Sequence, residues 1–167
     1  TNHMAEIDAI AELADSPTLE NTIIAMEKSG ALLDRVATVF FALISANTND
    51  EMEKIRSEMA PKLSAHSDQI LLNGKLFHRV KTIYEQRDQL GLDAESKRLV
   101  EKYYTDFIRS GANLSNEEKE SLKKINGEMA VLQTTFSQNV LKEVNALAVV
   151  VDFKNELDGL SDAAIEA

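Results

Sequence analysis

The sequence predicts an all-α fold, an antiparallel helical bundle of about six to seven helices with one short C-terminal β segment. Apolar residues recur every three or four positions almost from end to end, which is the period of a helix with one buried face. Only six Gly and two Pro occur in 167 residues, so turns are few and many-stranded β architectures are disfavoured. A composition of 44% apolar and 28% charged residues suits one globular domain with a modest core.

Cap residues and breaks delimit the first three predicted helices. Residues 5–14 form a short first helix. Ser16 followed by Pro17 is typical of a cap residue with proline in the first turn, so a second helix is expected to begin there. Gly30 permits a break, after which a third helix runs to the polar turn at residues 47–49. The apolar stripes of the second and third helices are Leu19, Ile23 and Met26, and Leu32, Val36, Val39, Phe40, Leu43 and Ile44.

The fourth helix is expected to begin at Thr48, because Thr48 and Glu51 have capping-box spacing. Pro61 interrupts this helix and removes a backbone donor, so a kink or a split near Met59 is expected. Its apolar stripe is Met52, Ile55, Met59, Leu63, His66 and Ile70.

Two further helices follow. Asn73 and Gly74 are expected to end the fourth helix, and the fifth runs as far as Gly91. Asp93 is the expected cap of the sixth helix, which stops near Gly111. Their stripes are Leu76, Phe77, Val80, Ile83 and Tyr84, and Leu99, Tyr103 and Phe107.

The longest helix opens at Ser115, which forms a second capping box with Glu118, and runs to about Val144. Its length is roughly 45 Å at about 1.5 Å per residue, so it needs an extensive partner surface. Steps of three and four suggest packing between long helices, and we expect the stripe to be the backbone of the core. The stripe is Leu122, Ile125, Met129, Leu132 and Phe136.

The pattern changes after this helix. Residues 147–151 are a β-branched apolar run that favours a buried strand, although an extension of the helix remains an alternative. No partner strand is evident, so this run is expected to pair with later sequence or to cause self-association. We interpret residues 1–3 as left from an expression vector, residues 4–146 as a helical domain of a larger protein, and residues 147–167 as a strand with the truncated start of the next region.

Charge and composition exclude several classes of function. Lys and Arg total 18 against 28 Asp and Glu, and the formal net charge of -10 disfavours nucleic acid and anionic membranes as partners. No run of about 18 apolar residues is evident, so no membrane span is expected. The absence of Cys removes thiolate catalysis and fits a reducing compartment, and we expect a cytoplasmic location.

Candidate chemistry is sparse. His66 lies on an apolar stripe, where a packing histidine is favoured over a ligand or general base, and His78 is most simply an exposed helix residue. His3 lies among the vector residues and carries no functional weight. The acidic residues at 116–120 are better explained by the helix dipole than by a bound cation. Core filling is a better explanation than an adaptable peptide-binding groove for Met52, Met59 and Met129. We interpret Tyr104 as an ordinary surface aromatic residue rather than a substrate contact.

Several stretches in register resemble the N-terminal part of bacterial peptidyl-dipeptidases, also called dipeptidyl carboxypeptidases. The resemblance covers nearly the whole chain from about Ala5. The stretches are PTLENTIIAMEKSG at 17–30, FFAL at 40–43, ANTND at 46–50, LGLD at 90–93, RLVE at 98–101, and residues 107–114.

The resemblance implies a parent enzyme of the thimet-oligopeptidase group, mostly helical zinc metallopeptidases with a deep channel between two halves. Such an enzyme removes dipeptides from peptide C-termini with zinc-activated water and a glutamate general base. Those groups belong to an HExxH helix and a later glutamate downstream in the family, and this chain carries neither. We therefore assign it no catalytic, cofactor-binding or metal residue, and zinc only to the parent.

Two function classes stay open. The first is a noncatalytic part of the peptidase that forms one wall of the channel, with the C-terminal catalytic region of the same polypeptide as its partner and short peptides as substrates of the parent. The second is a self-contained helical adaptor that binds partner helices. A reading frame that continues beyond Ala167 into HExxH favours the first, and a gene that ends at Ala167 favours the second.

Overall fold

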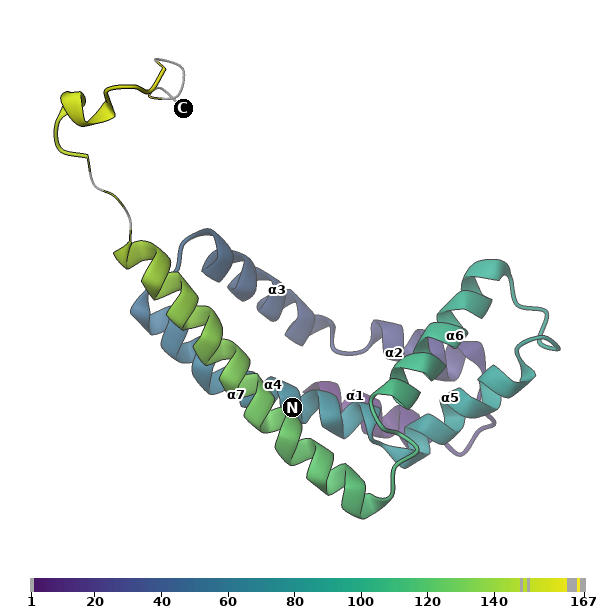
Figure 1. The fold of residues 1–167 in the computed structure, drawn as a ribbon. Coiled ribbons are helices and arrows are strands. Elements are labelled where there is room, and N and C mark those ends of the chain that lie inside the picture. Colours follow the sequence, from purple (N-terminus) through teal and green to yellow (C-terminus); the bar gives the residue numbers. More distant parts are fainter. Residues whose placement is uncertain (1, 148, 150, 162–164, 166–167) are drawn as a thin grey trace. The chain divides into compact units, whose positions relative to one another are not determined.

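The structure, a computed structural model, describes residues 2–147, 149, 151–161 and 165 (Figure 1). Every regular element in these residues is a helix, which confirms the all-α fold. The short β segment is not seen: Leu147, Val149 and Val151 lie outside any strand, and the other two residues of that run are outside the described part. The elements are α1 (Asn2–Ala11), the π-helix η1 (Leu19–Ile24), α2 (Ala25–Lys28), α3 (Ala31–Ala46), α4 (Asp50–Leu71), α5 (Gly74–Gln86), α6 (Ala94–Arg109), α7 (Asn116–Ala146) and the 3-10 turn η2 (Lys154–Leu157).

The chain divides into two compact units, Thr1–Thr134 and Thr135–Ala167. In the first unit, α5 and α6 pack against each other and against η1, while α1 contacts α5, α2, α3 and α4. The second unit contains the end of α7 and η2. The helix start expected at residues 160–167 falls mostly on residues outside the described part.

Helix starts near the N-terminus differ from the expectation. The cap of η1 is Thr18 and not Ser16, because the Thr18 hydroxyl accepts from the Asn21 backbone N–H at 3.1 Å while the Asn21 side chain accepts from the Thr18 N–H at 2.8 Å. Pro17 therefore precedes the cap. Gly30 has a φ of 70°, a left-handed conformation that favours glycine, and it provides the expected break before α3.

Helix α4 begins one residue later than expected and is not split. Its cap is Asn49, whose side-chain oxygen accepts from the Met52 N–H at 3.0 Å, whereas the Thr48 hydroxyl donates to Glu53. The helix continues through Pro61 to Leu71, so the predicted split near Met59 is wrong. Proline removes only one backbone donor, and a helix of 22 residues tolerates that loss.

The core of the first unit lies where α5 and α6 meet the N-terminal elements. The caps expected there are present: Asn73 accepts from the Lys75 and Leu76 N–H groups and opens α5 rather than ending α4, and Asp93 accepts from the Ser96 N–H. Four of the five residues of the α5 stripe are buried. The buried core consists of Ile7, Ala11, Ile23, Met26, Leu76, Phe77, Val80, Ile83, Val100, Phe107 and Ala112.

Helix α7 has the expected length and the expected capping box. The Ser115 N–H donates to Glu118 at 2.8 Å, and the Glu118 N–H donates to the Ser115 hydroxyl at 3.3 Å. The prediction that its stripe forms the backbone of the core is wrong, because Leu132 and Phe136 are 66% and 70% exposed. Thr134 is the residue of α7 that is buried, and Leu122, Asn126, Met129, Ala130 and Gln133 of α7 line a groove against α4.

One helical stretch, Leu19–Ala46, is long and apolar enough to cross a membrane by length and composition alone. The expectation that the chain has no such stretch is therefore wrong. Ile23 and Met26, near the start of the stretch, are buried in the core of the first unit, and Gly30 interrupts it. A core helix or a signal sequence passes the same test of composition, but only 6% of this window is buried and α3 has no buried residue.

Candidate functional site

A buried arginine organises the polar contacts of the first unit. Arg79 of α5 is 5% exposed, and its Nε donates to the Thr22 hydroxyl at 3.1 Å. Its Nη2 donates to the Asn21 side-chain oxygen at 2.9 Å. Its Nη1 donates to the backbone carbonyls of Leu13 and Asp15 at 2.9 and 3.0 Å. One guanidinium thus ties the segment after α1 to η1 and α5.

The environment of Arg79 is structural rather than reactive. Burial lowers the pKa of the guanidinium, and the charge of Asp15 opposes that change. All four of its acceptors are neutral protein groups, so the cation is satisfied by the fold itself. No signal in the sequence marks this residue, since an arginine within an amphipathic stripe resembles an exposed cation.

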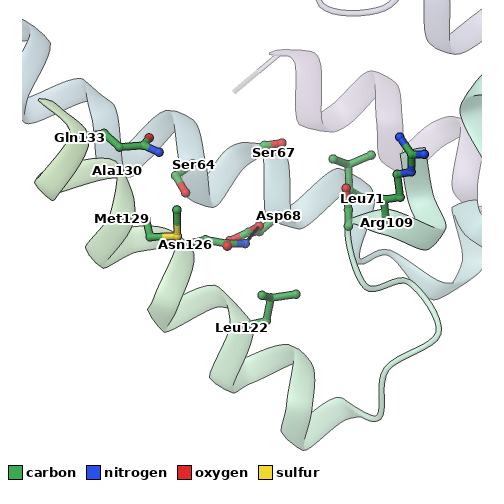
Figure 2. A pocket seen from close by; sticks show the side chains of 11 residues that line it. Ser64, Ser67, Asp68, Leu71, Arg109, Leu122, Asn126, Met129, Ala130 and Gln133 are labelled. Atoms are coloured by element: carbon green, nitrogen blue, oxygen red, sulfur yellow. Dashed lines mark hydrogen bonds between the residues drawn. The ribbon is translucent and has the colours of Figure 1, made fainter. Parts of the chain in front are cut away.

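A polar groove lies between α4, the C-terminal end of α6 and α7 (Figure 2). Its volume is about 410 Å³. The buried Asp68 accepts from the Asn126 side-chain amide at 2.7 Å, which joins α4 to α7. In Figure 2 the Arg109 guanidinium lies beyond Leu71 and away from that carboxylate. The groove is lined by Ser64, Ser67, Asp68, Leu71, Arg109, Ser110, Leu122, Asn126, Met129, Ala130 and Gln133.

The chemistry of this groove is limited. Its lining residues include serine hydroxyls and one carboxylate but no histidine, so no serine is paired with the kind of base that activates a nucleophile. The single carboxylate is already engaged by an amide donor. The groove can hold water or a small polar group, and it positions α7 against α4.

A second groove, between α3 and α4, is apolar. Its volume is about 250 Å³. Met59 lines it, Met52 is half-buried, and Met129 on α7 is 48% exposed. The preference for methionine as core filling is therefore wrong, because none of the three reaches the core. The lining residues are Leu33, Val36, Ala37, Phe40, Phe41, Ile55, Met59 and Leu63.

Two of the three histidines, His3 and His66, lie side by side. The His66 Nε2 lies 2.9 Å from the His3 Nδ1, and the His3 Nε2 lies 3.1 Å from the Ser29 hydroxyl. Burial and the neighbouring His3 lower the pKa of His66. His66 is thus a half-buried packing residue, as expected, and its partner His3 lies 63 residues away in sequence. His78 is exposed, as expected.

The two adjacent tyrosines are both engaged within the fold. The Tyr104 ring stacks on the Tyr84 ring at 3.8 Å between centroids, with the Arg87 guanidinium over the Tyr84 ring. Tyr103 donates its hydroxyl to Glu27 at 2.7 Å, and burial raises its pKa. Tyr104 is therefore part of an aromatic stack, and its ring face is not free for a substrate.

The described residues provide no metal centre. Within them, no three His, Cys, Asp or Glu side chains come together in a way that could hold an ion. Glu118 of the acidic stretch serves the capping box, and this hydrogen bonding lowers its pKa. The donor set of a peptidase zinc does not fit these residues.

Similarity to known proteins extends over nearly the whole chain. The chain is 44% identical over 156 residues to the "Dipeptidyl carboxypeptidase" of Salmonella typhimurium, which covers 93% of the chain and 23% of that protein. It is 42% identical over 161 residues to the "Dipeptidyl carboxypeptidase" of Escherichia coli, with 96% and 24% covered. An Arabidopsis thaliana "Probable cytosolic oligopeptidase A" is 24% identical over 164 residues, with 96% and 23% covered.

The chain therefore spans about a quarter of the length of the curated relatives that it matches. No family model matches it. The resemblance found in the sequence is confirmed, since the matched region is the N-terminal part of these relatives.

Proposed function

We propose that this chain, a relative of the N-terminal region of dipeptidyl carboxypeptidases, is the noncatalytic helical portion of a zinc metallopeptidase that removes dipeptides from the C-termini of oligopeptides. Its helices form part of the wall of the substrate channel and restrict substrates to unfolded peptides. The zinc and the general base lie in the C-terminal catalytic region of the same polypeptide. The observation that carries the proposal is the similarity along nearly the whole chain.

The chemistry of the described residues is compatible with a wall. The polar groove between α4, α6 and α7 lacks a histidine, and the apolar groove between α3 and α4 has no polar group among its lining residues. Both grooves offer surface for packing or for binding without a reacting group. A cytoplasmic location is part of the proposal, and one matched relative carries the word cytosolic in its name.

A self-contained helical adaptor is the second candidate. The observation that favours it is the exposure of large apolar side chains on α3 and α7, including Leu32 and Leu132, since such surfaces bind partner helices. The same exposure is expected of a helical part separated from its own catalytic region. The two candidates are distinguished by the coding sequence after Ala167, which the peptidase proposal expects to continue into a catalytic region.

The test reads the coding sequence beyond Ala167 and measures zinc in the purified product of the whole reading frame. The proposal predicts a continuing frame with HExxH and about one zinc per chain. A frame that ends at Ala167, or a longer product that carries no zinc, contradicts the peptidase and favours the adaptor.

A further inference from the structure

Helix α7 carries four large apolar side chains that are about half exposed or more. These residues follow one another in steps of four, three and four, so they line one side of the helix. All four are between 48% and 70% exposed. This outer stripe consists of Ile125, Met129, Leu132 and Phe136.

The side of α7 that faces α4 carries mainly small and polar residues, although Leu122 and Met129 also line the groove there. Asn126 donates to the buried Asp68 of α4, and Ala130 lines the groove between these helices. Thr134 is buried and returns its hydroxyl to the Ala130 carbonyl at 2.9 Å. A surface helix usually buries its large apolar residues, whereas Ile125, Leu132 and Phe136 of α7 are more than half exposed. The outer stripe therefore needs a second partner.

The spacing of the outer stripe indicates what kind of surface fits it. Large residues at alternating steps of three and four insert as knobs between the side chains of a facing helix. Such a row favours an apolar helical partner over an extended charged peptide.

We propose that the outer stripe of α7 is the docking face for helices of the remaining part of the same longer polypeptide, an inference that rests on the proposed function. About three quarters of each matched dipeptidyl carboxypeptidase has no counterpart in this chain, so ample sequence exists to cover the stripe. A second copy is disfavoured because each chain carries a net charge of -10. The same charge disfavours an anionic bilayer.

Thiol labelling tests this assignment directly. The chain has no Cys, so Leu132→Cys introduces its single thiol, and Lys124→Cys on another side of α7 is the matched control. Both variants are made in the 167-residue chain and in the product of the whole reading frame, there with any other cysteines replaced by Ser. Maleimide labelling rates are compared, with chelator-sensitive dipeptide release measured in parallel. Ile125→Cys repeats the measurement if Leu132→Cys alters the helical circular dichroism.

We expect the thiols at 132 and 124 to label at similar rates in the 167-residue chain, and the thiol at 132 to label at least about tenfold more slowly in the whole protein. Equal rates in the whole protein overturn the docking face. If labelling of the thiol at 132 in the 167-residue chain slows as the protein concentration rises, the stripe binds a second copy. If labelling slows only with anionic vesicles, the stripe binds a bilayer. Either result also overturns the proposed docking face.

The two proposals fail separately. If the thiol at 132 is protected from maleimide in the whole protein but no dipeptide is released, the docking face is supported and the peptidase function is rejected. If dipeptides are released but the thiol is not protected, the peptidase function is supported and the docking face is rejected. A reading frame that ends at Ala167 overturns both.

Discussion

Replacement of Arg79 by Ala removes the buried cation that ties the segment after α1 to η1 and α5. Four acceptors lose a charged donor: the Thr22 hydroxyl, the Asn21 side-chain oxygen, and the carbonyls of Leu13 and Asp15. The loss is expected to disorder this polar junction before it affects the aromatic core around Phe107.

The expected loss of stability depends on which hydrogen-bond donors each acceptor still has after Arg79 is removed. A hydrogen bond to a charged group contributes about 1.5–3 kcal/mol, but the four contacts of one side chain are not additive. The Leu13 and Asp15 carbonyls belong to exposed residues and can regain water, and Asn21 keeps the Thr18 N–H and the Thr22 hydroxyl as donors. Thr22 is fully buried and keeps only its own donation to Asn21. We therefore expect Arg79→Ala to lower the free energy of unfolding by about 2–4 kcal/mol, with the buried Thr22 hydroxyl as the largest contribution.

The assay is urea unfolding of the 167-residue chain, followed by far-ultraviolet circular dichroism. Arg98→Ala is the matched control, because the Arg98 side chain is 80% exposed and its ion pair with Glu101 measures 3.6 Å, so a change within about 0.5 kcal/mol is expected. Arg79→Lys is expected to fall between the two, since one ammonium cannot reach all four acceptors. A loss below about 1 kcal/mol for Arg79→Ala, or no loss for Arg79→Lys, refutes the reasoning.

Three further predictions concern the core, the histidines and zinc. Phe107→Ala should lower the free energy of unfolding by about 3–5 kcal/mol in urea unfolding, because Phe107 is fully buried. Leu132→Ala should change it by less than about 0.5 kcal/mol, because Leu132 is exposed. Comparable losses for the two variants would contradict the burial pattern. The pKa of His66 in the folded state lies below the ordinary 6.5, so the unfolded state binds more protons and stability should fall as the pH drops below 6.5. In denaturation measured across pH 5–7, His66→Gln should weaken this pH dependence of stability. An unchanged pH dependence in the variant would contradict the prediction. The 167-residue chain should neither bind zinc tightly nor cleave peptides, and turnover that His66→Gln or His78→Gln abolishes would contradict this.

Local signals in the sequence predicted the fold well. Side chains next to each other in sequence decide helix caps, so Asp93 and the Ser115–Glu118 box were found from spacing alone. The α5 stripe was found because one face of a short helix buries against neighbours inside this chain. The cap of η1 was missed by two residues, since Ser16 and Thr18 are both good caps and the choice depends on the Asn21 side chain.

Interactions between distant segments were harder to predict. Periodicity shows that one face of α7 is apolar, but it cannot show which part of a protein covers that face, and the outer stripe is open in this chain. Arg79 escaped notice for the same reason, because its four acceptors lie more than fifty residues away in sequence. The strand expected at residues 147–151 was inferred from β-branched composition, which does not distinguish a strand from a chain segment without its partner.

The peptidase assignment is tested most directly by the products released from a blocked oligopeptide. The product of the whole reading frame and the 167-residue chain are each incubated with the peptide, with and without a zinc chelator, and the released peptides are identified by mass spectrometry. The account predicts C-terminal dipeptides from the whole protein, loss of that release on chelation, and no release by the 167-residue chain. Release by the 167-residue chain alone, or release by the whole protein that a chelator leaves unchanged, would contradict it.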